Sequence, residues 1–210
     1  MVRNGSAGSM GWREEQAFFD RLADSWDAMA RPETLARLTD IITGLGLSSG
    51  ARVLDVGCGT GVLFALLRSC IGDQGLLIGL DVSRRMLDYA VARGDADLCI
   101  QADAENPPLC DRMFDWIICN AVLPHFTDKA ATLRALCRCL APHGTLVICH
   151  ANSREMINAI HRRAGGAVAD DRLPDPATLT TLLLQSGLSP VHTLDGIDRY
   201  VMIARPMIAR

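Results

Sequence analysis

A short glycine-rich run is the part of this sequence best suited to binding a ligand. Residues 53–61 read VLDVGCGTG, an apolar stretch that leads directly into glycines. Gly57, Gly59 and Gly61 let the backbone approach a ligand closely and adopt φ values that a Cβ would penalise. The spacing is GxGxG, whereas dinucleotide-binding turns usually read GxGxxG. We therefore expect Gly57, Cys58, Gly59 and Gly61 to line a binding pocket between a strand and a helix.

Two carboxylates accompany this run. Asp55 falls just inside the expected strand, where a charge is costly unless a cationic ligand or the N–H groups of the glycine turn partner it. Asp81 ends the next expected strand, 20 residues after Gly61. In doubly wound folds a carboxylate at this place accepts hydrogen bonds from ribose hydroxyls. An N-cap for the helix near Ser83 is the alternative. Because the glycine-rich run and this carboxylate occur together, we expect Asp81 and the following Val82 to bind a nucleoside.

Three histidines could serve a second site. His125 follows the fourth expected strand, His150 ends the fifth, and His161 lies on the next expected helix with Arg154 and Asn158 on the same face. Three interpretations stay open. The first is a solvated helix face with a structural histidine. The second is an acid–base site with His125 or His150 as the base and Arg154 holding an anionic group. The third is a zinc or iron site formed by His125, His150 and His161.

The elements that must position these residues alternate along the chain. Apolar strands separated by helices predict a parallel sheet covered on both faces. The expected strands are 52–56, 75–80, 97–101, 114–120, 144–150, 188–194 and 199–204, the last two joined in an antiparallel hairpin by Asp195-Gly196. The expected helices are 12–30, 32–47, 62–70, 83–93, 128–140, 153–162 and 177–186. We expect one domain over residues 12–210, preceded by a disordered Gly/Ser-rich leader over residues 1–11.

Composition narrows the class of protein. The net charge is −3, and Lys129 is the one lysine among 210 residues, so no basic stripe predicts nucleic-acid binding. No uncharged apolar run approaches the ~18 residues of a membrane span, and residues 1–11 lack the apolar run of a signal peptide. Eight cysteines without a CxxC pair indicate buried free thiols in the cytoplasm, with a catalytic or metal role for one or two as the alternative.

With these motifs in place, residues 19–150 resemble a class I S-adenosylmethionine-dependent methyltransferase, near the ubiquinone and menaquinone biosynthesis group. The run 53–61 resembles the family's glycine motif, Asp81 its ribose-binding acid, and Asp103-Ala104 its adenine-contacting motif. Met86 matches a residue that packs on the adenine. Trp26 belongs to a stretch similar to the family's N-terminal helix, which closes over the cofactor.

Two further stretches carry the resemblance. Residues 114–120 resemble the family's fourth strand, and residues 140–146 resemble the approach to its fifth strand, with His143 in place of a glycine in an expected loop. The resemblance implies a Rossmann-like doubly wound α/β fold with seven strands, mostly parallel with an antiparallel last strand, plus N-terminal helices.

The resemblance also implies a reaction. S-adenosyl-L-methionine would be the cofactor and a small molecule the methyl acceptor, and a base is needed only when the acceptor loses a proton. The carboxylates Asp55, Asp81 and Asp103 then hold the cofactor. Asn120 is placed to contact the cofactor and orient the acceptor, and Arg154 favours an acceptor with an acidic group. The alternatives are a non-catalytic protein that binds S-adenosylmethionine or S-adenosylhomocysteine, and an NAD-dependent oxidoreductase. Monomer and homodimer both stay open.

Overall fold

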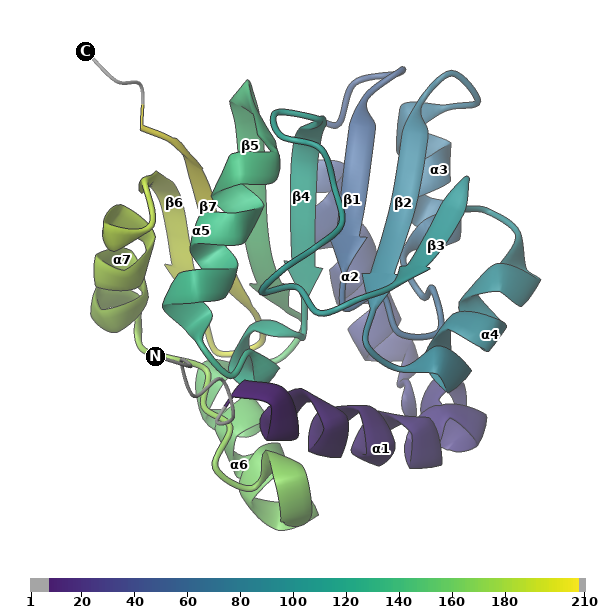
Figure 1. Cartoon of the computed structure of the whole chain (residues 1–210), viewed down its shortest axis with the longest axis vertical. Helices are drawn as coiled ribbons and strands as arrows, with labels where there is room; N and C mark the ends of the chain where they lie inside the picture. The colour runs from purple at the N-terminus through teal and green to yellow at the C-terminus, as the bar shows by residue number, and fades with distance from the viewer. Residues whose placement is uncertain (1–7, 208–210) are drawn as a thin grey trace, which may run out of the picture.

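The structure, a computed structural model, describes residues 8–207, which build one seven-stranded sheet (Figure 1). The strand order is β3-β2-β1-β4-β5-β7-β6, and β7 runs antiparallel to both of its neighbours. This confirms the predicted Rossmann-like sheet and its hairpin. The strands are β1 (Arg52–Val56), β2 (Leu76–Asp81), β3 (Leu98–Gln101), β4 (Phe114–Asn120), β5 (Leu140–His150), β6 (Leu188–Asp195) and β7 (Tyr200–Pro206).

Strand β5 departs most from its predicted start. It begins at Leu140 rather than at residue 144, because Leu140 pairs with Phe114 ahead of a register shift between Phe114 and Trp116. His143, expected in a loop, therefore lies within the irregular first part of the strand. The other strands begin and end within two residues of the prediction.

Seven α-helices and three short 3-10 helices connect the strands in the described part of the chain. The α-helices are α1 (Gly8–Trp26), α2 (Pro32–Gly44), α3 (Phe64–Ile71), α4 (Arg84–Arg93), α5 (Lys129–Cys139), α6 (Arg154–Ala164) and α7 (Pro176–Gln185). The 3-10 helices are η1 (Asp27–Met29), η2 (Leu123–His125) and η3 (Gly166–Val168). Helix α1 begins at Gly8, so residues 8–11 of the expected leader are helical, and residues 1–7 lie outside the described residues.

Side-chain alternation along the strands divides the core into two layers. In β1, Leu54 joins a cluster that includes α5 and α7, whereas Val53 joins a second cluster that includes α2, α3 and α4. In β4, Ile117 and Ile118 divide in the same way. Figure 1 shows α2 and α3 behind the sheet and α5 in front of it. Burial on both faces explains why these strands are apolar at almost every position.

Helix α1 crosses the carboxyl edge of the sheet (Figure 1). Its carboxylates fasten it to α4 and to the loop before α4. Asp20 Oδ1 accepts a hydrogen bond from Ser83 Oγ at 2.6 Å, and Asp24 Oδ1 accepts from Arg85 at 2.6 Å and from Tyr89 Oη at 2.8 Å. A chain segment near residue 20 is thereby tied to the end of β2 at the edge where doubly wound folds bind ligands.

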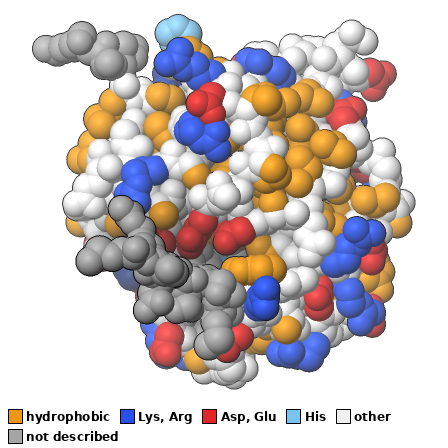
Figure 2. Space-filling model, viewed as in Figure 1, with side chains coloured by type: hydrophobic (Ala, Val, Ile, Leu, Met, Phe, Trp, Pro, Cys, Tyr) orange, Lys and Arg blue, Asp and Glu red, His pale blue; other side chains and the backbone are white. Residues whose placement is uncertain are grey.

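Three further features concern the helices, the surface charge and the cysteines. No helix within residues 8–207 is long and apolar enough to cross a membrane. Figure 2 shows acidic and basic side chains interspersed on the face that it presents. All eight cysteines are free, and four of them (Cys58, Cys119, Cys139 and Cys149) are buried, while Cys110 is exposed.

Candidate active site

A cavity of about 470 Å³ opens at the carboxyl ends of β1, β2 and β4. This is the edge where the strand order reverses between β1 and β4, the usual ligand site of a doubly wound sheet. Helix α1 supplies one wall and α6 another, with the glycine turn after β1 between them. The volume is within the range of small-molecule pockets, about 300–1,000 Å³.

The glycine turn is held tightly against its neighbours. The backbone N–H groups of Gly57 and Cys58 both donate to Leu80 O of β2, at 2.7 and 3.1 Å. Gly57 has a φ of +64°, and a Cβ on it would lie 2.3 Å from Val122 Cγ2. No other residue type fits there without displacing Val122. Gly57, Cys58 and Gly59 line the cavity, as predicted.

Gly61 is the exception in this run. It is not among the residues that line the cavity, and a Cβ on it would lie 2.7 Å from the ring of Phe64. Contact between Gly61 and the ligand therefore stays a prediction that the lining of this cavity does not support. Its small size serves the packing of α3 against the turn, a role that the glycine spacing alone does not separate from ligand contact.

Asp81 organises the turn from the neighbouring strand. Its buried carboxylate accepts hydrogen bonds from Gly59 N–H and from Ser83 N–H, both at 2.8 Å. Burial raises the pKa of Asp81, and these N–H groups oppose the rise. The helix α4 is capped by Ser83, whose Oγ accepts from Met86 N–H. The N-cap alternative for Asp81 is therefore wrong, and the residue lines the cavity.

Asp55 is the least satisfied polar group of the site. It is 1% exposed, and its Oδ2 has no hydrogen-bond partner within the described residues. Burial, assisted by the charge of Asp81, raises the pKa of Asp55 to about 8. The N–H group of Gly59 goes to Asp81, so it does not supply the partner that the sequence allowed for Asp55.

The remaining residues predicted to bind the cofactor also line the cavity. They are Trp26, Val82, Met86, Asp103, Ala104 and Asn120. Trp26 extends over the glycine turn, since a Cβ on Gly59 would lie 3.7 Å from Trp26 Nε1. Asp27, the next residue, accepts a hydrogen bond from Thr60 Oγ1 at 2.6 Å and pairs with Arg93 at 2.5 Å.

The three histidines do not form one site. His125 and His161 line the cavity with their ring centroids 4.8 Å apart. His150 is 1% exposed, does not line the cavity, and burial lowers its pKa to about 3. Within residues 8–207, no three His, Cys, Asp or Glu side chains are grouped to hold a metal ion. The structure therefore contradicts the three-histidine metal site and the use of His150 as a base.

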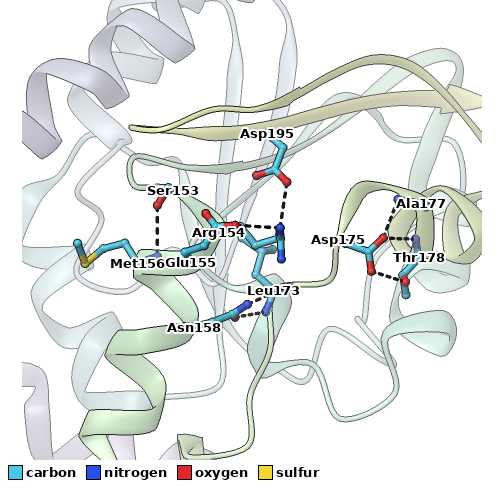
Figure 3. Close-up of polar contacts among 10 residues, drawn as sticks. All are labelled: Ser153, Arg154, Glu155, Met156, Asn158, Leu173, Asp175, Ala177, Thr178 and Asp195. Atoms are coloured by element: carbon cyan, nitrogen blue, oxygen red, sulfur yellow. Dashed lines mark hydrogen bonds and ion pairs between the residues drawn. The ribbon is translucent and has the colours of Figure 1, made fainter.

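Arg154 is also not among the residues that line the cavity. Its guanidinium pairs with Asp195 of β6 at 3.0 Å and with Glu155 at 2.9 Å (Figure 3). Asn158, on the same helix, exchanges hydrogen bonds with the backbone of Leu173. The structure does not support the prediction that Arg154 holds an anionic acceptor group, because its guanidinium is paired with two carboxylates and it is not among the residues that line the cavity.

Two residues of the site were missed by the sequence analysis. The first is Asp171, whose Oδ2 lies 2.5 Å from His125 Nδ1. The second is Glu15, whose pKa is raised to about 8 by burial together with the charges of Asp171, Asp103 and Glu105. The sequence did indicate a place for Glu15 on the buried side of the first helix, because it precedes Phe19 by four residues and so lies in the apolar stripe of that helix. No sequence pattern indicated a role for Asp171, because it stands in a polar loop.

Comparison with known proteins gives a family for this architecture. Residues 47–179 match the family described as a methyltransferase domain. Over 110 residues the chain is 37% identical to the ubiquinone/menaquinone biosynthesis C-methyltransferase of Vibrio campbellii, covering 49% of this chain and 42% of that protein. A relative of the same name from Francisella philomiragia is 34% identical over 113 residues, covering 51% and 45%. The chain thus spans less than half the length of these relatives.

Solved structures share the fold over most of the chain. A SAM-dependent methyltransferase from Aquifex aeolicus aligns with a TM-score of 0.73 and 21% identity, covering 88% of this chain and 97% of that one. The magnesium protoporphyrin IX methyltransferase of Synechocystis, solved with bound SAH, aligns with a TM-score of 0.69 and 17% identity, covering 93% and 99%.

Proposed function

This chain belongs to the class I methyltransferase domain family, and we propose that it transfers a methyl group from S-adenosylmethionine to a small-molecule acceptor. The observation that carries the proposal is the pair of buried carboxylates on neighbouring strands. Asp55 is the last but one residue of β1 and has an unpartnered Oδ2 within the described residues, and Asp81 ends β2 beside the glycine turn. Both line one cavity of suitable size.

The residues present fit this cofactor. Asp81 can accept hydrogen bonds from ribose hydroxyls with the lone pairs that Gly59 and Ser83 leave free. The unpartnered Asp55 Oδ2 suits the cationic amino-acid end, which would supply the missing partner. Met86, Asp103 and Ala104 line the part of the cavity beyond β2, where the adenine would lie.

When bound, the cofactor supplies a sulfonium whose methyl group is open to in-line attack. The chain's task is then to align the acceptor and to exclude water, because charge disappears from sulfur as the methyl leaves. Phe18, Phe19 and Leu22 of α1 line the cavity opposite the glycine turn. Asn120, which accepts a weak hydrogen bond from Cys149 Sγ through Oδ1, keeps its amide N–H groups available to orient an acceptor.

The acceptor is proposed to be small because the cavity is enclosed by α1 and α6 and is mostly apolar. The acidic net charge gives no support to a nucleic-acid acceptor. The family match removes the oxidoreductase alternative. The non-catalytic alternative has no observation in its favour and is tested by turnover.

Calorimetric titration with S-adenosylmethionine, S-adenosylhomocysteine and NAD tests binding. We expect the first two to bind and NAD not to bind. Incubation with methyl-labelled S-adenosylmethionine and a small-molecule cell extract tests transfer, with Asp81→Asn as the matched inactive control. Label transferred by the wild type but not by the variant supports the proposal. Binding without any transfer would favour the non-catalytic alternative.

A further inference from the structure

One residue, Asp171, holds both histidines of the cavity. Its carboxylate Oδ2 lies 2.5 Å from His125 Nδ1, and its main-chain carbonyl oxygen lies 3.2 Å from His161 Nδ1. The side chains of His125 and Asp171 are 12% and 17% exposed, so solvent screens their interaction little. Asp171 stands in the loop between η3 and α7, and His125 ends η2, so the contact joins segments 46 residues apart.

These contacts decide which ring nitrogens carry protons. Oxygens of a carboxylate and a carbonyl only accept hydrogen bonds, so the Nδ1 atom of each ring must be the donor. In the neutral imidazole the lone pair is then on Nε2. No hydrogen bond engages Nε2 of His125 or His161 within residues 8–207, and both side chains line the cavity. Phe19 packs edge-on against the His125 ring, with centroids 5.1 Å apart.

The two rings differ in their partners. His125 Nδ1 contacts the carboxylate of Asp171, whereas His161 Nδ1 contacts a neutral main-chain carbonyl. Burial together with the nearby His125 lowers the pKa of His161. Of the two rings, His125 is therefore the one with a carboxylate positioned beside it.

We infer that His125 is the general base of the reaction, that Asp171 is its positioning residue, and that the acceptor is a protic nucleophile, with an O–H, N–H or acidic C–H group. The inference rests on the proposed methyl transfer and narrows its substrate class. A tertiary amine or a thioether, which has no proton to lose, would not need this arrangement.

The proton and electron balance is complete without another reactant. The acceptor's electron pair forms the bond to the methyl carbon while the carbon–sulfur bond breaks, and that bond's electrons stay on sulfur. The acceptor proton moves to His125 Nε2. The resulting imidazolium stays paired with the Asp171 carboxylate until it loses its proton to solvent.

Other titratable groups near this pair must be considered in any pH profile. Besides burial, Asp171 shifts the pKa of Glu15 of α1 and of Lys129 of α5, and Asp103 after β3 acts on Glu15 in turn. Burial and the nearby His125 lower the pKa of His150 of β5 and of His161 of α6, and His150 is neutral. Glu15, with its pKa raised to about 8, titrates near neutral pH. The test therefore uses a signal specific to each ring rather than a pH–rate profile alone.

The first experiment is heteronuclear NMR of the full chain with ¹⁵N-labelled histidine, saturated with S-adenosylhomocysteine. We expect both His125 and His161 to carry the neutral proton on Nδ1. In Asp171→Asn the main-chain carbonyl remains, so His161 keeps this tautomer, whereas His125 changes from a single tautomer to a mixture, because the amide can donate to Nδ1 as well as accept from it. Asp170→Asn, a matched control at the neighbouring exposed position, leaves both unchanged. A wild-type His125 with its proton on Nε2 overturns the inference.

The second experiment compares turnover with cofactor affinity. With labelled S-adenosylmethionine and a small-molecule extract, we expect His125→Gln and Asp171→Asn to lose at least ~100-fold in rate, the usual weight of a general base. Their Kd for S-adenosylmethionine should stay within about threefold of the wild type, and Asp170→Asn should retain its rate. Retained turnover in either variant overturns the inference. A wild type that fails to bind S-adenosylmethionine overturns the proposed function instead, and the histidine tautomers are measured independently of that result.

Discussion

Gly59 donates its backbone N–H to Asp81 Oδ2 at 2.8 Å, so the carboxylate that ends β2 also fixes the glycine turn that follows β1. Binding residue and backbone turn are thus parts of one hydrogen-bonded unit across two strands. A change at Asp81 removes a ligand contact and loosens the turn at the same time.

We expect Asp81→Asn to weaken S-adenosylmethionine binding by about 2–4 kcal/mol, or roughly 30- to 1,000-fold in Kd, since charge-assisted hydrogen bonds are lost. Isothermal titration measures the change. Asp88→Asn is the control, because it removes a carboxylate from an exposed ion pair with Arg84 on α4. Equal affinity for the wild type and Asp81→Asn would contradict the ribose-binding role.

Cofactor binding should release a proton at neutral pH. Asp55, with a pKa raised to about 8, is mostly protonated at pH 7, and a cation bound beside it favours the ionised form. Affinity should therefore rise as the pH increases from ~6 to ~8, by at most about tenfold per unit. Calorimetry in buffers of different ionisation enthalpy counts the proton, and Asp55→Asn should abolish the release. Proton release that survives in this variant would place the titration elsewhere.

Stability without ligand should fall as the pH rises from about 4 to about 8. Asp55 and Glu15 both have a pKa raised in the folded state, to about 8, so between these values the folded chain holds more protons than the unfolded chain. Asp55→Asn should remove part of this fall and stabilise the protein at pH 8, on the order of 2 kcal/mol. Urea denaturation at several pH values measures it, with Glu15→Gln separating the second group. A pH-independent stability would contradict the burial of a protonated Asp55.

Tryptophan fluorescence should report the bound cofactor. Trp26 lines the cavity above the glycine turn, Trp12 lines it as well, and Trp116 lies within β4 and is not among the lining residues. In a Trp12→Phe background, we expect Trp26→Phe to lose most of the fluorescence change caused by S-adenosylmethionine, and Trp116→Phe to retain it. The opposite pattern would mean that Trp26 does not cover the cofactor.

Gly57→Ala should lower the free energy of unfolding by more than the strain of placing an alanine at a positive φ. The added Cβ would lie 2.3 Å from Val122 Cγ2, and overpacking of this kind costs about 1–3 kcal/mol. Gly46→Ala is the matched control: Gly46 has a similar φ of +70°, but nothing lies within 4 Å of an added Cβ. Thermal or chemical denaturation should show a larger loss for Gly57→Ala. Equal losses of stability in the two variants would show that Val122 moves aside at no cost in stability.

Local patterns in the sequence were enough for the fold and for the cofactor side of the site. Strands 52–56 and 114–120 begin and end where predicted, because apolar runs bounded by glycine or polar residues define them. Asp81 was placed by its distance from the glycine run. These inferences depend on neighbours in the sequence or on adjacent strands, whose relation the doubly wound topology fixes.

The acceptor side depended on contacts between remote segments. His125 and Asn120 line the cavity as expected, but other predictions there failed. Arg154 had an apparent role on a polar helix face, but its partner Asp195 lies 41 residues later. His150 ends a strand as expected, yet burial removes it from the cavity. Asp171 is important through a contact with His125 that no local spacing indicates.

The fastening of α1 and η1 by Asp20, Asp24 and Asp27 predicts a kinetic consequence. We expect a cofactor held beneath Trp26 to exchange for its spent form at a rate that depends on how fast these polar contacts loosen. Because Asp24 and its partner Arg85 are exposed, dissolved salt screens their attraction. Raising the ionic strength should therefore shorten product residence, and an enzyme limited by release would turn over faster in salt although its chemistry is unaltered.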